Sequence, residues 1–189
     1  MKILFLPLLL ASAAGPFLFP GREAEPAAAA AVQDPLAPGP QHAQLQELVG
    51  TWDAVTITTD EQGAEQRTKG TLVRVKHTDY HTLDSYEGEF MGMKFLGHGV
   101  NGYCPVKKQY YTLWTDSMTP TPMIVYGDYD AGKRELSLSG ECYGMSGKLE
   151  PCRTVTRYRD GDHYTFQFLG AGPDGKEMAH FTIEYTRRK

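Results

Sequence analysis

Residues 97–130 decide the fold, and they read GHGVNGYCPVKKQYYTLWTDSMTPTPMIVYGDYD. Three runs rich in β-branched and aromatic residues are separated here by two turns. The first turn is the polar segment 105–108, and the second, residues 119–122, contains two prolines, which cannot donate a backbone hydrogen bond to a sheet. The stretch therefore predicts short consecutive strands joined by tight turns, which is typical of antiparallel pairing.

The same alternation of apolar runs and turn residues continues on both sides of this stretch. It indicates a short helix at residues 41–48 and strands at 52–59, 71–77, 80–90, 95–103, 109–118, 123–130, 135–142, 151–160, 163–169 and 178–187. Residues 60–70 are polar and contain two glycines, and we expect a loop there. Because a meander of about ten strands has unpaired edges unless it closes, the pattern predicts an all-β chain folded as a single antiparallel up-and-down β-barrel with a short N-terminal helix.

The strand expected at residues 95–103 contains three glycines, Gly97, Gly99 and Gly102. Glycine weakens a strand because it has no side chain to pack, and it often marks a bend or a place where another group approaches the backbone closely. We therefore expect this strand to be bent within the barrel wall.

The N-terminal residues differ in composition from the rest of the chain. Lys2, an apolar run at residues 3–10 and the small residues Ala11-Ser12-Ala13 are typical of a signal peptide, which we place at residues 1–20. Residues 21–40 are rich in Ala and Pro, so we expect a disordered tether there. Residues 41–189 then form one domain. We expect the protein to be exported to the periplasm, the cell envelope or the extracellular space, with membrane contact only if the N-terminal segment stays uncleaved.

The chain is mildly acidic, with a formal net charge of −4. Residues 41–189 contain 17 basic and 20 acidic side chains, so the domain lacks the basic excess that non-specific binding to nucleic-acid phosphates requires. We therefore expect no nucleic-acid partner. The sequence pattern leaves the oligomeric state open.

Several short motifs occur along the chain in a particular order. They are Gly50-Thr51-Trp52, Met91-Gly92-Met93, Gly102-Tyr103, Trp114-Thr115-Asp116-Ser117-Met118, Gly127-Asp128-Tyr129-Asp130, Gly172-Pro173-Asp174-Gly175-Lys176-Glu177 and Tyr185-Thr186-Arg187-Arg188. Together, over about residues 45–189, they resemble the bacterial domain of unknown function 1579 family. The resemblance implies a lipocalin-like, or calycin, antiparallel barrel and no settled activity. The family usually has Asp after the Gly-Tyr pair, where this chain has Cys104, so any turn-capping role of that Asp is not carried over.

Calycins tend to place a Gly-x-Trp motif on the first strand and an Arg on the last strand, stacked at the closed end of the barrel. Trp52 supplies the indole in this chain. On the last expected strand, Phe181, Ile183, Tyr185 and Arg187 share one face by the two-residue period of a strand. Arg187 is therefore expected to point inward and to lie over Trp52 as a cation–π pair with a structural role.

Two of the three cysteines, Cys142 and Cys152, bracket a loop centred near Gly147. A hairpin folded about Gly147 would place them opposite each other, and an exported protein permits a disulfide there. The alternative is two unpaired thiols on the same face. Cys104 is the odd cysteine. Apart from two neighbouring lysines, nothing nearby in the sequence would lower the pKa of its thiol, so a role as a nucleophile is not favoured.

The histidines do not have the spacing of a zinc site, and we expect no metal and no cofactor. His77 and His81 lie across a turn, and His98 lies between two glycines. Barrels of the nitrobindin type bind haem through a His near the C-terminal strand, and His180 raises this alternative. His180, however, shares a strand face with Glu184, and we expect this face to contact solvent.

The aromatic side chains of the central strands favour a binding function. We expect a small apolar or amphipathic ligand inside the barrel, held by aromatic rings with polar tips and by one or two polar side chains. The candidate ligand-binding residues are Tyr103, Tyr111, Trp114, Asp116, Tyr126 and His98.

Two other functions compete with this interpretation. A barrel filled by its own side chains would serve as a structural or interaction protein of the cell envelope, and a large exposed apolar patch would favour it. A hydrolase or isomerase would use Asp116 with His98 or Cys104, which requires these groups to lie on one face of the wall. Against the enzyme, Asp116 and Asp130 flank turns, where carboxylates commonly cap backbone donors.

Overall fold

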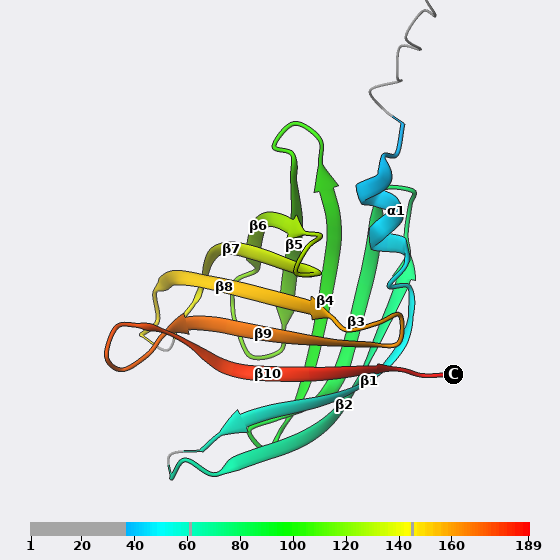
Figure 1. Cartoon of the computed structure of the whole chain (residues 1–189). Helices are drawn as coiled ribbons and strands as arrows, with labels where there is room; N and C mark the ends of the chain where they lie inside the picture. Colours follow the sequence, from blue (N-terminus) through cyan, green and yellow to red (C-terminus); the bar gives the residue numbers. More distant parts are fainter. Residues whose placement is uncertain (1–36, 61, 145) are drawn as a thin grey trace, which may run out of the picture. The chain divides into compact units, whose positions relative to one another are not determined.

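The computed structural model describes residues 37–60, 62–144 and 146–189, which form a short helix and a closed barrel of ten antiparallel strands (Figure 1). The elements are α1 (Pro40–Gln46), β1 (Gly50–Thr59), β2 (Glu65–Lys76), β3 (His81–Phe90), β4 (Met93–Cys104), β5 (Gln109–Asp116), β6 (Met123–Asp130), β7 (Glu135–Tyr143), β8 (Leu149–Tyr158), β9 (His163–Ala171) and β10 (Glu177–Arg187). The predicted signal peptide, residues 1–20, and most of the predicted tether, residues 21–40, lie outside the described residues. Within the described part, no helix is long and apolar enough to cross a membrane.

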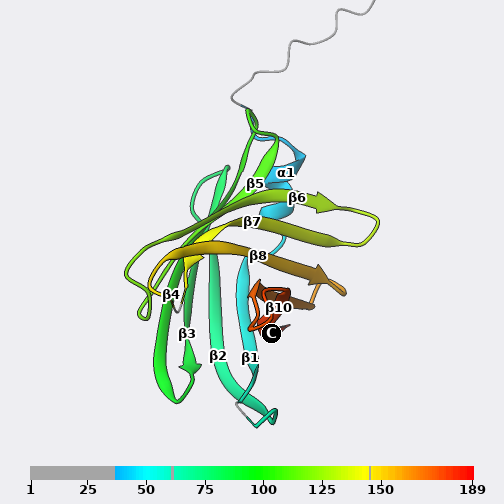
Figure 2. The same cartoon turned by 90° about the vertical axis from the view of Figure 1, so that its left-hand side faces the viewer.

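Each strand pairs with its neighbours along the chain, and β1 pairs with β10 to close the barrel. Figures 1 and 2 show β7 and β8 running across the direction of β3 and β4, as strands on different walls of a twisted barrel do. The predicted all-β fold, a single antiparallel up-and-down barrel with a short N-terminal helix, is confirmed.

The prediction of a loop at residues 60–70 was wrong, because β2 begins at Glu65. The first half of β2 is polar and largely exposed, and it pairs with β1 as far as Thr59. Backbone pairing rather than burial stabilises this segment, so its composition is similar to that of a loop. Gly70 belongs to the strand because its missing side chain makes room for Tyr86. A Cβ at Gly70 would lie 2.3 Å from the Tyr86 hydroxyl.

The glycines of β4 also accommodate aromatic rings. A Cβ at Gly97 would lie 2.1 Å from Cζ2 of Trp114, and a Cβ at Gly99 would lie 3.0 Å from Cε3 of the same ring. On the other face of the strand, a Cβ at Gly102 would lie 2.5 Å from the hydroxyl of Tyr111. The three glycines therefore allow rings from β5 to pack directly against the backbone of β4.

The inward-facing side chains form two apolar clusters. Their buried members are Trp52, Ala54, Leu72, Tyr86, Tyr164, Ile183 and Tyr185 in the first, and Leu45, Tyr110, Val125, Leu138 and Cys152 in the second. Leu45 belongs to α1, so the helix contributes to the second cluster. Below, "the α1 end" means the end of the barrel at which the odd-numbered strands begin.

Arg187 joins several segments at the α1 end. Its guanidinium carbon lies 4.1 Å from the centroid of the Trp52 ring, and the two residues are register partners across β1 and β10. The guanidinium also donates to the carbonyls of Val49 at 2.8 Å, Glu47 at 2.9 Å and Gly161 at 3.0 Å. The cation–π contact expected from the sequence is present, and it joins the α1–β1 connection to the β8–β9 turn.

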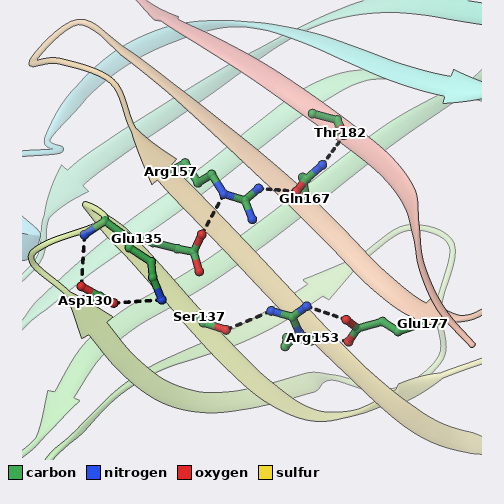
Figure 3. Close-up of polar contacts among 9 residues, drawn as sticks. Asp130, Glu135, Ser137, Arg153, Arg157, Gln167, Glu177 and Thr182 are labelled. Atoms are coloured by element: carbon green, nitrogen blue, oxygen red, sulfur yellow. Dashed lines mark hydrogen bonds and ion pairs between the residues drawn. The ribbon is translucent and has the colours of Figure 1, made fainter.

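The outer wall over β7–β10 is covered by a polar network (Figure 3). Arg157 donates to Glu135 at 2.7 Å, and Arg153 donates to both carboxylate oxygens of Glu177. Val155 lies on this outer face between Arg153 and Arg157 and is nevertheless fully buried. The long side chains of the network therefore exclude water from the apolar part of this wall.

The outer wall over β2–β6 has a different composition. One apolar residue from each of the five strands lies in cross-strand register with the next, and we call this set the apolar row. Its members are Val75, Leu83, Val100, Leu113 and Ile124. The two ends of the row are the most open, since Val75 is 47% and Ile124 is 42% exposed.

Candidate functional site

A polar network lies inside the barrel near the α1 end. The Arg74 guanidinium donates two hydrogen bonds to the Asp84 carboxylate, at 2.6 and 2.7 Å. The Asn101 amide donates to the same carboxylate at 3.0 Å, and the Thr112 hydroxyl donates to the Asn101 amide oxygen at 2.8 Å. The Arg74 and Asp84 side chains are only 12% and 6% exposed. A complete ion pair is therefore buried in the barrel, with further hydrogen bonds to its carboxylate.

Two opposing effects act on the charge of Arg74. Burial lowers the pKa of Arg74, but the charge of Asp84 and its hydrogen bonds outweigh this and raise the pKa overall. The guanidinium therefore stays charged at every physiological pH. The pair contributes no net charge to the interior, because one positive and one negative group neutralise each other.

Tyr164 lies beside this ion pair and is held from two sides. Its ring stacks on Tyr185 at a centroid distance of 4.5 Å and meets the Trp52 ring edge-on at 4.7 Å. Tyr164 is only 5% exposed, and its hydroxyl has no hydrogen-bond partner among the described residues. Burial raises the pKa of Tyr164. Its hydroxyl is therefore protonated at neutral pH and is able both to donate and to accept a hydrogen bond.

A pocket with a volume of about 410 Å³ opens at the α1 end. The helix, the ends of β4–β6 and the adjoining turns supply its lining, which consists of Pro40, Gln41, Gln44, Tyr103, Lys108, Tyr110, Asp128, Tyr129 and Ala131. The Tyr110 hydroxyl donates to the side-chain oxygen of Gln44 at 2.6 Å, and burial raises the pKa of Tyr110 to about 12. The pocket thus combines aromatic rings and amides with one lysine and one aspartate.

Three tyrosines connect this pocket with the buried ion pair, and we call them the tyrosine row. Tyr129 lines the pocket, and its ring centroid lies 6.0 Å from that of Tyr158. The Tyr158 centroid in turn lies 6.0 Å from that of Tyr164. Tyr129 and Tyr158 lie on inward-facing positions and are partly buried. The candidate functional site consists of the pocket, the tyrosine row and the Arg74–Asp84 pair.

Three of the six candidate residues chosen from the sequence lie on inward-facing positions. Tyr103 lines the pocket, and Trp114 packs against the first apolar cluster. Asp116 accepts hydrogen bonds from the Trp114 indole at 3.2 Å and from the backbone N–H groups of Met118 and Thr119 at 2.8 and 2.9 Å. Asp116 therefore caps the turn after β5. This is the turn-capping role that the sequence indicated as the alternative to acid–base catalysis.

The other three candidates, Tyr111, Tyr126 and His98, lie on the outer face of the wall. The Tyr111 hydroxyl is 2.7 Å from Nε2 of His81, and the Lys107 ammonium lies 3.7 Å from the centroid of the Tyr126 ring. His98 is exposed. Because side chains alternate along a strand, these three residues point away from the pocket.

The groups required by the enzyme alternative are not brought together. Asp116 is the register partner of Gly97, and His98 is the register partner of Thr115, so Asp116 and His98 project from opposite faces of the wall. Cys104 lies at the α1 end of β4. Gly97, which marks the level of Asp116 and His98, lies toward the other end of this strand. No pair among these three groups shares a site.

Arg74 and Asp84 were not among the candidate residues predicted from the sequence. A signal was available, since Arg74 lies two residues from Leu72 and Asp84 lies two residues from Tyr86, each on an inward face. A charge at a position whose strand neighbours are apolar indicates a buried partner. That the partner of Arg74 is Asp84 depends on the β2–β3 register, in which the two residues are opposite each other.

The prediction that Cys142 and Cys152 lie opposite each other was wrong. The hairpin register places Cys142 opposite Glu150 and Cys152 opposite Gly140, so the two cysteines are offset by two residues on one face. All three cysteines are free in the described part of the chain. Burial raises the pKa of Cys142 and of Cys152, whose thiols share a hydrogen bond. Cys104 accepts a hydrogen bond at 3.5 Å from a backbone N–H of the turn that follows it.

His42, His77 and His81 lie near one another, whereas His98, His163 and His180 lie on β4, β9 and β10. His180 is exposed on β10, with its ring centroid 6.1 Å from that of Phe168. Burial lowers the pKa of His81, and the nearby His77 and His42 lower it further. Across residues 37–60, 62–144 and 146–189, no group of three or more His, Cys, Asp or Glu side chains is arranged to hold a metal ion.

Comparison with solved structures finds the same fold in distant proteins. The crystal structure of Rv2717c from M. tuberculosis is similar with a TM-score of 0.60 and 12% sequence identity, over 81% of this chain and 100% of that chain. The S-type phycobiliprotein lyase CPES from Guillardia theta gives a TM-score of 0.51 and 9% identity, over 78% of this chain and 92% of that chain. Among proteins with curated functions, none matches. The model of one family matches residues 37–187, and the chain therefore belongs to that family, the proteins of unknown function DUF1579.

Proposed function

We propose that this barrel binds a small amphipathic molecule at its α1 end. The observation that carries the proposal is the pocket of about 410 Å³, because Tyr129 of its aromatic lining is the first of three neighbouring tyrosine rings, the tyrosine row. The volume lies within the range of small-molecule sites. Tyrosine rings offer apolar area and their hydroxyls offer hydrogen bonds, so a ligand with an apolar body and few polar groups matches the site.

Nile red, an uncharged dye that fluoresces more strongly in apolar surroundings, tests this proposal on the full chain. We expect saturable binding by the wild-type protein. Ala131→Trp would place an indole in the pocket, and we expect it to weaken binding by about tenfold or more. Ala64→Trp, in an exposed loop at the other end of the barrel, is the matched control. Absence of saturable binding, or equal weakening by both variants, would overturn the proposal.

We also propose that the protein is exported. The support is the charged, apolar and small-residue pattern of residues 1–13. Expression of the full chain in a bacterial host, followed by fractionation and mass spectrometry, tests it. We expect the protein outside the cytoplasm, with an N-terminus that follows Ala11-Ser12-Ala13. A full-length mass confined to the cytoplasmic fraction would contradict export.

The apolar row favours a second candidate function, that of an interaction protein. Its five residues lie side by side over β2–β6, and its two ends are the most exposed. A second copy of this chain is the occupant to test, since two such faces would bury each other's apolar side chains. Sedimentation velocity should then show dimers that Val75→Lys with Ile124→Lys disrupts. A monomer at every concentration would exclude this function.

A further inference from the structure

We propose that the bound ligand presents an uncharged hydrogen-bonding group, a hydroxyl or a carbonyl, to the buried Tyr164 hydroxyl. This inference rests on the proposed function, because it names the chemical class of the molecule that the barrel binds. The ligand class is a compact apolar, preferably aromatic, body with a neutral polar group at its leading end.

The state of the Tyr164 hydroxyl supports this inference. It is buried, and no described residue accepts or donates a hydrogen bond to it. Leaving such a group unpaired costs free energy, because it has lost its hydrogen bonds to water. The ring cannot turn away to find a partner, since Tyr185 stacks on it and Trp52 meets it edge-on. The hydroxyl is therefore fixed in place. A ligand can supply the hydrogen-bond partner that the described residues do not provide.

The charged groups around that hydroxyl also favour a neutral ligand group. The charged side chains that interact with Tyr164 are Arg74, Asp84 and Arg187. Arg74 is neutralised by two hydrogen bonds to Asp84, and Arg187 is occupied by Trp52 and by backbone carbonyls. A charged ligand group would lose its water without gaining an unpaired opposite charge. A neutral group avoids that cost.

Ring contacts also connect Tyr164 with the pocket. Tyr164 is the most buried member of the tyrosine row, and Tyr129, at the other end of the row, lines the pocket. We expect a flat apolar molecule bound in the pocket to extend along these rings, so that its leading atom meets the Tyr164 hydroxyl. Offset or edge-on contacts between aromatic rings favour a planar ligand over a flexible chain of the same area.

Three rigid fluorescent probes of one shape test the inference: naphthalene, 2-naphthol and 2-naphthoate. Titration of the full chain at about pH 7 compares an apolar probe with its neutral hydroxyl and anionic carboxylate derivatives. We expect 2-naphthol to bind about fivefold more tightly than naphthalene, which corresponds to one net hydrogen bond. We expect 2-naphthoate to bind at least about tenfold more weakly than 2-naphthol.

Tyr164→Phe removes the hydroxyl and keeps the ring. We expect it to abolish the preference for 2-naphthol over naphthalene. Tyr143→Phe makes the same chemical deletion at an exposed hairpin position and should preserve the preference. Because the deleted hydroxyl has no hydrogen-bond partner among the residues that the structure describes, Tyr164→Phe should remain folded.

The outcomes separate the inference from the proposed function. If Nile red and all three probes fail to bind, the proposed function fails and this inference fails with it. If Nile red binds but 2-naphthoate binds as tightly as 2-naphthol, the barrel binds ligands and the inference about their charge is wrong. If Tyr164→Phe keeps the full preference for 2-naphthol, the hydroxyl is not the group that recognises the ligand.

Discussion

Two arginine–carboxylate pairs with the same hydrogen-bond chemistry lie in different surroundings in this barrel. Arg74 and Asp84 face the interior and are 12% and 6% exposed, whereas Arg153 and Glu177 lie on the outer wall and are 33% and 47% exposed (Figure 3). In both pairs the guanidinium donates two hydrogen bonds to its carboxylate. The pairs differ mainly in their contact with solvent, and the comparison therefore isolates the effect of burial.

Burial makes each member of the interior pair depend on the other. An ion removed from water loses several kcal/mol of solvation, and only a well-placed partner offsets that loss. On the outer wall, water solvates whichever charge remains when its partner is deleted. Arg187, with a side chain that is 24% exposed, lies between these cases. The three arginines thus form a series in which disruption should cost less as exposure rises.

The largest effect is expected for Asp84→Ala. This change leaves the Arg74 guanidinium buried without a counter-charge and deprives Asn101 of an acceptor. We expect the free energy of unfolding to fall by about 3–5 kcal/mol, measured by urea denaturation with tryptophan fluorescence. An ordinary domain has about 5–15 kcal/mol of stability, so the variant should be close to unfolding at 37 °C or below.

A double variant shows whether burial is the cause. Arg74→Met combined with Asp84→Leu removes both charges and replaces them with apolar side chains. Such replacements are often neutral or stabilising, and we expect the double variant to recover most of the stability lost in Asp84→Ala. If Asp84→Ala alone cost less than about 1 kcal/mol, the interior pair would be solvated and the contrast with the outer wall would disappear.

Arg187→Ala should have an intermediate effect. The change removes the cation–π contact with Trp52 and three hydrogen bonds to backbone carbonyls, some of which water can replace at the barrel end. We expect a loss of about 2 kcal/mol in the free energy of unfolding. Arg187→Lys keeps the charge but lacks the planar fork, so it should recover less than half of the loss. Full recovery by Lys would show that charge alone is needed.

The fold was predictable because the relevant signals are local to each strand. Apolar runs and turn residues fixed the number of strands and their antiparallel order. The exception is the first half of β2, residues 65–70, where exposed polar side chains hide a strand that is stabilised by pairing with β1. The residue composition of a segment indicates whether the segment is buried. Residues 65–70 are paired with β1 but are not buried.

The site was less predictable because it depends on which face points inward and on register. Tyr110 and Tyr111 are adjacent aromatic residues, so the two-residue period alone does not show which one enters the barrel. Tyr110 is buried and Tyr111 packs over Gly102 on the outside. The two cysteines of the β7–β8 hairpin were misplaced for a related reason, since the turn sets the register and its centre was misjudged.

Arg153→Ala, at the exposed end of the series, should have a small effect. Its carboxylate partner Glu177 remains solvated when the guanidinium is removed, and water already screens the pair. We expect a loss of about 0.5 kcal/mol in the free energy of unfolding, and we expect the difference from wild type to shrink further in about 1 M NaCl. A loss comparable to that of Asp84→Ala would mean that Arg153 acts chiefly by covering Val155.

The smallest predicted effect is the pH dependence of the outer pair, tested with Glu177→Gln. The hydrogen bond from Arg153 lowers the pKa of Glu177, with partial opposition from desolvation. The folded state therefore binds this proton more weakly than the unfolded state does. The stabilisation is complete above the unfolded pKa of about 4.3 and is lost as pH falls through the lower folded pKa.

After allowance for solvent screening, the difference in free energy of unfolding between wild type and Glu177→Gln should be about 0.3 kcal/mol near neutral pH. It should stay constant down to about pH 5 and vanish near about pH 3, as followed by urea denaturation across this range. The exposed pair can lose its charge in acid without unfolding the barrel, because water solvates what remains. A difference that grew on acidification would contradict the lowered pKa, and with it the view that this pair differs from the interior pair mainly in its exposure.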